Sequence, residues 1–161
     1  MSNTYELSPE NAHIKARELF KEEFYWSPIE ETSPFGSDDG SDAFYQFREW
    51  RETNKTASPF IFIETLLDTW GYSRGPAPHD AEVVEYLMER SVLGTNNVII
   101  AVGFGQFVLE GKIDKDLLAR TIQSVEAECA PSRLSVFAED YRSTRLEQLT
   151  ILRKALDKMA L

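Results

Sequence analysis

A twelve-residue apolar run, from Val98 to Leu109, decides the fold class of this chain. The run is rich in β-branched residues, and Gly103 and Gly105 would each cost about 1 kcal/mol relative to alanine inside a helix. Twelve residues is long for a strand, however, and asparagines precede the run while Gly111 follows it. We therefore expect a buried helix whose glycines permit close contacts. If the segment is instead a strand, the fold is α+β.

The rest of the chain reads as a series of helices. Ser-Pro pairs at Ser8 and Ser58 are strong start signals, because a capping side chain precedes a proline at the first helical position. Seven helices are expected, over residues 8–26, 41–54, 58–70, 80–92, 98–109, 114–130 and 143–159, with a shorter piece at 135–141 and loops at 27–40 and 72–79. The sequence predicts an all-α, compact bundle of about seven helices that forms one domain over residues 1–161.

Several of these boundaries depend on single residues. Gly71 and Gly94 are expected to end the helices that precede them, and Asp80 and Asp114 to cap the helices that follow. Thr144 and Glu147 have the spacing of a capping box, which places the start of the last helix at Ser143 or Thr144.

Composition narrows the class of protein further. Of the 161 residues, 42% are hydrophobic and 27% charged, as in an ordinary soluble domain. No stretch reaches about 18 uninterrupted apolar residues, and the first residues lack the basic and apolar regions of a secretory signal. The one cysteine, Cys129, excludes a disulfide framework. We expect a cytoplasmic protein with no membrane partner.

Metal-binding motifs are incomplete. His13 and His79 lie in different predicted elements, and neither has a cysteine or carboxylate at metal-ligand spacing. The acidic cluster 37–42 offers several oxygen atoms on a tight turn, as hard cations require, but aligning its glycine with the sixth EF-hand position puts Phe35 where an aspartate is required. Asp38 or Asp39 is instead expected to cap the next helix, with partner contact and metal binding as alternatives.

Catalytic and nucleotide-binding motifs are incomplete as well. Gly103-Phe104-Gly105 lacks the third glycine of a dinucleotide fingerprint, and the stretch from Gly105 to Lys112 has the wrong spacing for a phosphate loop. Cys129 lies on the apolar stripe of its predicted helix, as a buried thiol does. We expect no enzymatic activity, no cofactor and no metal. The alternative is a small-molecule binder or enzyme with a carboxylate-lined pocket near the two glycines.

The negative charge of the chain is unevenly distributed. The net charge is −10, which argues against nucleic acid and anionic membranes as partners. Residues 1–52 carry 12 acidic and 5 basic residues, whereas residues 133–161 carry 4 acidic and 6 basic residues. Between Lys21 and Arg48 there are seven acids and no base.

Aromatic residues are interleaved with these acids. Such a combination suits a site for a basic protein, because aromatic anchors bury area and carboxylates steer the encounter. The predicted partner-binding residues are Glu22, Glu23, Trp26, Glu30, Glu31, Phe35, Asp38, Asp39, Asp42 and Tyr45. The alternative interpretation is that the aromatics belong to the core and the acids form a solvated face.

The segment from Pro34 to Phe44, continuing to Trp50, resembles the Phe-x-Asn-Asp-x-x-x-Asp openings of some uncharacterised small bacterial proteins, with Ser37 where those openings favour asparagine. The chain as a whole, acidic and poor in motifs, is similar in character to bacterial immunity proteins that neutralise a toxin. That resemblance implies a non-enzymatic protein whose basic partner is a toxin domain. A structural homo-oligomer is the third hypothesis, and the oligomeric state is left open.

Overall fold

The computed structural model describes residues 5–72 and 81–160, with side chains for all of these except residues 81–89. Over these residues the chain forms seven α-helices and no strand, so the predicted all-α fold is confirmed. The helices are α1 (Ile14–Leu19), α2 (Asp38–Thr53), α3 (Pro59–Trp70), α4 (Ala81–Glu110), α5 (Lys115–Glu128), α6 (Pro131–Leu134) and α7 (Glu139–Met159). Two short 3₁₀ helices, η1 (Pro9–Asn11) and η2 (Glu23–Trp26), flank α1.

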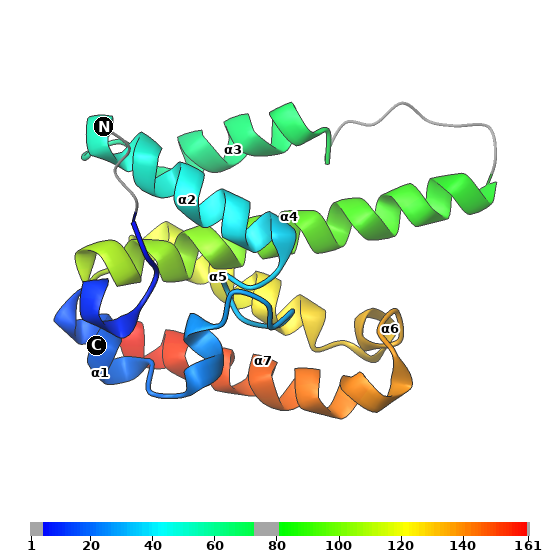
Figure 1. Cartoon of the computed structure of the whole chain (residues 1–161). Helices are drawn as coiled ribbons and strands as arrows, with labels where there is room; N and C mark the ends of the chain where they lie inside the picture. Colours follow the sequence, from blue (N-terminus) through cyan, green and yellow to red (C-terminus); the bar gives the residue numbers. More distant parts are fainter. Residues whose placement is uncertain (1–4, 73–80, 161) are drawn as a thin grey trace.

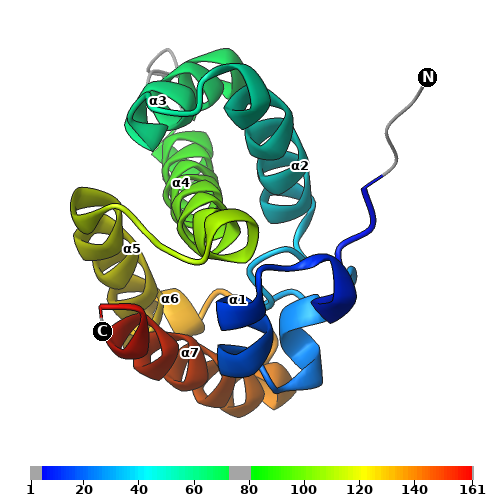
Figure 2. The same cartoon turned by 90° about the vertical axis from the view of Figure 1, so that its left-hand side faces the viewer.

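The long helix α4 is the centre of the bundle (Figure 1). It packs against α1, α2, α3 and α5, which surround its C-terminal part in an end-on view, with α7 on the far side of α5 and α1 (Figure 2). Two groups of buried side chains meet α4. One, around Phe20, Phe104 and Leu152, joins it to α1, α5 and α7. The other, around Phe47 and Phe62, joins it to α2 and α3.

The apolar run 98–109 is helical, as predicted, but it is not a separate helix. The chain remains helical through Gly94, which therefore does not end a helix. A Cβ on Gly94 would lie 2.6 Å from the ring of Tyr72, so this glycine allows the end of α3 to approach α4 closely. Helix α4 ends at Glu110, and the following Gly111 has a φ of +71°, the left-handed conformation that commonly follows a helix.

Gly103 and Gly105 make the close contacts expected of them. A Cβ on Gly103 would lie 2.3 Å from Thr121 Oγ1 on α5, and a Cβ on Gly105 would lie 2.9 Å from Phe44 Cδ1 on α2. The two glycines therefore let α5 and α2 approach the central helix. The alternative prediction placed a ligand pocket near these glycines, but neighbouring side chains fill that space.

The segment 8–26 is not the single helix that its periodicity predicted. It is broken into η1, α1 and η2. His13, between η1 and α1, donates its backbone N–H to Val108 O at 2.8 Å, and its ring nitrogen Nδ1 accepts from Lys15 N at 3.1 Å as a cap of α1. Phe20 ends α1 and stacks on Tyr25 with ring centroids 4.6 Å apart. The bends allow Phe20 and Tyr25 to be buried together, and this tertiary packing overrides the local pattern.

Two other boundaries differ from the prediction. Helix α2 begins at Asp38 rather than Ser41, and its cap is Ser37, whose Oγ accepts from Gly40 N at 3.0 Å. Asp38 and Asp39 therefore lie in the first turn instead of capping it. Helix α7 begins at Glu139, so Thr144 and Glu147 lie inside the helix, and the short α6 precedes the predicted piece at 135–141.

Several other predicted boundaries are confirmed. Ser58 caps α3 with Pro59 at its first position, and Gly71 ends that helix with a φ of +73°. Asp114 stands at the start of α5, although its side chain accepts from Gln106 Nε2 at 3.0 Å instead of bonding to its own helix. The predicted loop beyond Tyr72 and the predicted cap at Asp80 lie outside the described residues.

One part of α4, Arg90–Glu110, is long and apolar enough to cross a membrane by length and composition alone. However, 72% of its apolar window is buried inside the protein. The core helix of a bundle meets the same criterion, so this stretch is weak evidence for or against a membrane location.

Candidate functional site

The ten predicted partner-binding residues lie on one continuous stretch, residues 22–45, which comprises η2, the loop 27–37 and the first half of α2. In Figure 1 this stretch runs from blue to cyan across the front of the bundle, between α7 and α2. Tyr25 OH donates to Ile151 O on α7 at 3.5 Å, and Gln148 Nε2 on α7 donates to Glu30 Oε1 at 3.4 Å. The stretch is therefore attached to the middle of α7.

The seven carboxylates of this stretch form no salt bridge within the described part of the chain. Five of them are exposed: Glu22, Glu23, Glu31, Asp38 and Asp42. The other two are half-buried and hydrogen-bonded. Glu30 accepts from Gln148, and Asp39 accepts from Tyr72 OH at 2.6 Å. Burial and the bonded Asp39 carboxylate raise the pKa of Tyr72 to about 12.

The aromatic residues of the stretch are mostly core. Phe35 is 1% exposed and packs against Phe44 with ring centroids 4.7 Å apart, so it offers no surface to a partner and the prediction that it contacts one does not fit its position. Trp26 is half-buried, and its ring N–H donates to Phe20 O at 3.0 Å. Tyr45 is 39% exposed. Among the predicted aromatic anchors, Tyr45 and one side of Trp26 reach the surface.

The most exposed apolar side chain of this stretch belongs to a residue that was not among the ten predicted. Ile29 is 86% exposed, more than any other large hydrophobic residue in the described part of the chain. It lies in the loop directly before Glu30 and Glu31. The signal that could have found it is its setting, because an isolated isoleucine beside Pro28, outside any periodic pattern, has no helix face to bury it.

The loop that carries Ile29 is tightly bonded within itself. Ser27 Oγ accepts from the backbone N–H groups of Ile29 and Glu30, at 3.2 and 3.0 Å. Ser33 N donates to Glu30 O at 3.0 Å, and Ser33 Oγ donates to Tyr25 O at 3.2 Å. A Cβ on Gly36 would lie 2.0 Å from Glu30 O, so only glycine fits where the loop folds back on itself.

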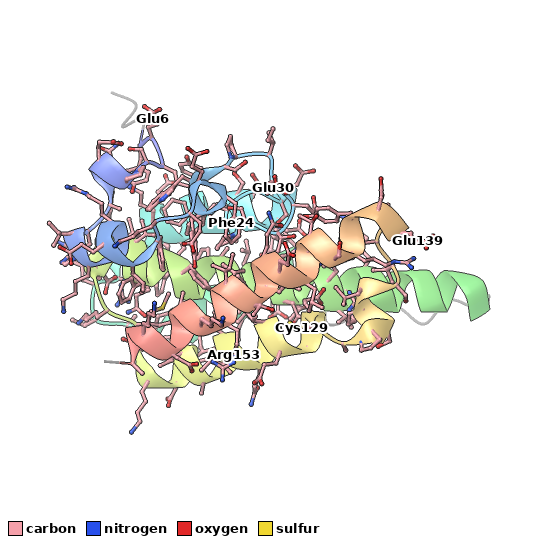
Figure 3. The ribbon with its side chains drawn as sticks, turned by 90° about the horizontal axis from the view of Figure 1, so that it is seen from below. Glu6, Phe24, Glu30, Cys129, Glu139 and Arg153 are labelled. Atoms are coloured by element: carbon pink, nitrogen blue, oxygen red, sulfur yellow. The ribbon has the colours of Figure 1, made fainter. Side chains whose placement is uncertain are left out.

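Helix α7 adds acids to this region that the sequence did not place there. The hydroxyl groups of Thr32 in the loop and Tyr141 in α7 are hydrogen-bonded. This contact puts the loop beside the first turn of α7, where Glu139 and Asp140 are exposed. In Figure 3, Phe24 and Glu30 lie alongside α7, and Glu139 lies at its N-terminal end.

A buried charge cluster lies beneath the loop. Glu128, the last residue of α5, is 0% exposed and pairs with Arg145 Nη2 at 3.1 Å and Arg133 Nε at 3.2 Å. Asn96 Nδ2 on α4 donates to Glu128 Oε2 at 2.7 Å. Arg145 Nη1 donates to Thr32 Oγ1 at 3.2 Å, which connects this cluster to the loop. Burial raises the pKa of the adjacent Cys129 thiol, as expected for an unreactive cysteine.

Open cavities lie near the C-terminal end of α4. One, of about 430 Å³, lies between Lys15, Phe107 and Lys158. Another, of about 410 Å³, lies between Arg48, Lys55 and Leu109. Neither is lined by Gly103, Gly105 or the acids of residues 22–45. No group of three or more metal-ligating side chains occurs in the residues searched, 5–72 and 90–160.

No protein-family model matches the chain, and neither a curated protein nor a solved structure matches it.

Proposed function

We propose that this protein is a non-enzymatic binding protein that covers a basic surface of another protein. The binding surface, called here the acidic surface, consists of Ile29, Glu30, Glu31, Asp38, Asp42 and Tyr45, with Glu22 and Glu23 at its edge. The observation that carries the proposal is the exposed Ile29 beside carboxylates that form no salt bridge. An apolar anchor next to free negative charge complements a partner that has an apolar pocket rimmed by lysine and arginine.

The physical roles of the two residue types differ. Burial of Ile29 in a partner removes apolar area from water, which strengthens binding and slows dissociation. The exposed carboxylates attract a basic partner over about 10 Å at 0.1 M salt, which speeds association. Because the loop is already bonded within itself, binding loses little entropy in ordering it.

The similarity in character to bacterial immunity proteins favours a toxin domain as the basic partner. An immunity protein acts by occupying its toxin and needs no catalytic group, cofactor or metal of its own. The proposal therefore includes a cytoplasmic location and a partner encoded beside this chain.

The test is to purify the product of the reading frame adjacent to the gene and to measure its binding by surface plasmon resonance at 50 and 500 mM salt. We expect the association rate to fall at least tenfold at high salt. Ile29→Ala should weaken binding at least tenfold through faster dissociation, and Glu30→Gln with Glu31→Gln should mainly slow association.

The matched controls lie on α3, away from the acidic surface. Ile61 is exposed like Ile29, and Glu64 is an exposed acid on the same helix. Ile61→Ala and Glu64→Gln should leave both rate constants unchanged. Binding that ignores salt and is equally affected by the α3 variants would overturn the proposal.

A further inference from the structure

We infer that Arg145 is a positioning residue: from inside the protein it holds in place the loop 27–37, which carries part of the acidic surface. The inference rests on the proposed function. Arg145 is 2% exposed and lies on α7. One end of its guanidinium pairs with the buried Glu128 carboxylate, and the other donates to Thr32 Oγ1 in the loop. Its charged centre also lies 4.0 Å above the ring of Phe137. A planar guanidinium can make all of these contacts at once.

The cluster is not arranged for maximum stability. It places the buried Arg145 and the half-buried Arg133 against one carboxylate, and the atoms Arg133 Nη2 and Arg145 Nε lack a hydrogen-bond partner. Buried ion pairs of this kind often contribute less to stability than well-packed apolar residues, since desolvation offsets the attraction. What the cluster does supply is a fixed direction for the Arg145 side chain, because Glu128 is itself fixed by Asn96 and Arg133.

Thr32 is the loop residue that the fixed guanidinium of Arg145 contacts. It is 5% exposed and lies directly after Glu31, within three residues of Ile29. Its Oγ1 is shared by Arg145 and Tyr141, both on α7. The other polar contact from this part of the loop to α7 is the long one between Glu30 and Gln148, at 3.4 Å. Without the Arg145 contact, Thr32 keeps only the Tyr141 hydroxyl as a polar partner on α7, so we expect Ile29, Glu30 and Glu31 to be held less firmly while the helices remain packed.

The experiment is hydrogen–deuterium exchange of the free full-length protein, which needs no partner. Thr32→Val keeps the shape of the side chain but removes the hydroxyl, and Thr32→Ser keeps the hydroxyl. We expect amides 27–33 to exchange about tenfold faster in Thr32→Val, with α5 and α7 unchanged, and Thr32→Ser to restore the wild-type rates. The matched control is Thr150→Val, since the exposed Thr150 hydroxyl donates only within its own helix, to Leu146 O at 2.7 Å.

Two further variants separate Arg145 from Tyr141. Arg145→Lys keeps a positive charge opposite Glu128, but a single ammonium group cannot span Glu128 and Thr32 as a guanidinium does. It should therefore loosen the loop, although less than Thr32→Val does, because the contact between Thr32 and Tyr141 remains. Tyr141→Phe removes the Tyr141 hydroxyl and leaves the Arg145 contact, so loop exchange should stay within about twofold of wild type.

Unchanged loop exchange in Thr32→Val and Arg145→Lys would overturn the inference. So would a loss of protection spread evenly over all helices, or a loop loosened by Tyr141→Phe but not by Arg145→Lys. These outcomes are distinct from failure of the proposed function, which is measured by the effect of Ile29→Ala on partner binding. A loop that loosens as described, together with binding that ignores Ile29, would support the positioning role and reject the acidic surface as the binding site.

Discussion

The acidic surface and the buried charge cluster beneath it use charged residues in opposite ways. In the cluster, Glu128 and Arg145 are buried and each is paired with a residue from another helix. On the surface, Glu31, Asp38 and Asp42 are exposed and form no ion pair in the described part of the chain. The cluster therefore fixes structure, and the surface leaves its charge available to a partner. Charge substitutions should separate these two roles through their effects on stability.

The largest effect is expected for Glu128→Gln. This change leaves the buried Arg145 and the half-buried Arg133 without a compensating charge, and it should lower the free energy of unfolding by about 3 kcal/mol. Urea denaturation followed by circular dichroism measures it. Glu126→Gln is the control, because Glu126 is an exposed residue on the same helix whose contact with Arg153 is 3.9 Å long. A loss below about 1 kcal/mol in Glu128→Gln would mean that the cluster does not hold the helices together.

A smaller effect is expected within the acidic stretch, where Ser37 caps α2. Ser37→Ala removes the acceptor for Gly40 N and should cost about 1 kcal/mol in the same denaturation experiment. Ser132→Ala, at a serine with an exposed side chain in α6, is the comparison and should have almost no effect. Equal losses in both variants would contradict the capping role of Ser37.

Asp39 is intermediate between the two regions, since it is half-buried and bonded to Tyr72. The pKa of Tyr72 is raised to about 12, above the ordinary value of 10 that it has in the unfolded chain. The stabilisation from this tyrosine is therefore fully present below pH 10 and is lost as the pH rises through 12. Tyr72→Phe should remove about 1 kcal/mol near pH 7. The difference from wild type should shrink above pH 10.

Ultraviolet titration checks the same pair directly. Asp39→Asn removes the negative charge beside the phenol, so the pKa of Tyr72 should fall toward 10. Asp42→Asn serves as the control, because Asp42 is exposed on the same helix. A tyrosine titration that is identical in wild type and Asp39→Asn would refute the coupling.

The smallest effect is expected for the exposed acids themselves. Asp38→Asn and Asp42→Asn should each change the free energy of unfolding by less than about 0.5 kcal/mol, because neither carboxylate has an ion pair to lose. Thermal unfolding at low salt measures this. A loss above 1 kcal/mol would show that these charges stabilise the fold and are not free for a partner.

Much of the fold could be predicted from local signals. The Ser58-Pro59 start, the Gly71 stop and the helical nature of 98–109 follow from capping, backbone conformation and segment length. The continuity of α4 could not be predicted, because Gly94 looks like a stop unless its contact with Tyr72 is known. The broken helix at 8–26 likewise depends on Phe20 and Tyr25 packing against each other and against distant helices.

The candidate site could be predicted only in part, because it depends both on charge and on the exposure of side chains. Charge is a property of the sequence, so the base-free stretch between Lys21 and Arg48 can be found by counting. Exposure is a property of packing. A prediction made without knowledge of exposure therefore assigned the buried Phe35 to the surface and omitted Ile29. The acids at the start of α7 join the region only through the contact between Thr32 and Tyr141.

The contacts between residues 22–37 and α7 also determine when the acidic surface can form during synthesis of the chain. Its contacts join residues far apart in the chain, 126 positions for Tyr25 and Ile151 and 113 for Thr32 and Arg145. Contacts of such long range form late, because closing a long segment of chain costs entropy before any contact rewards it. A nascent chain on the ribosome therefore has no finished acidic surface until α7 emerges. The first third of the sequence supplies the surface, and the last 20 or so residues determine when that surface exists.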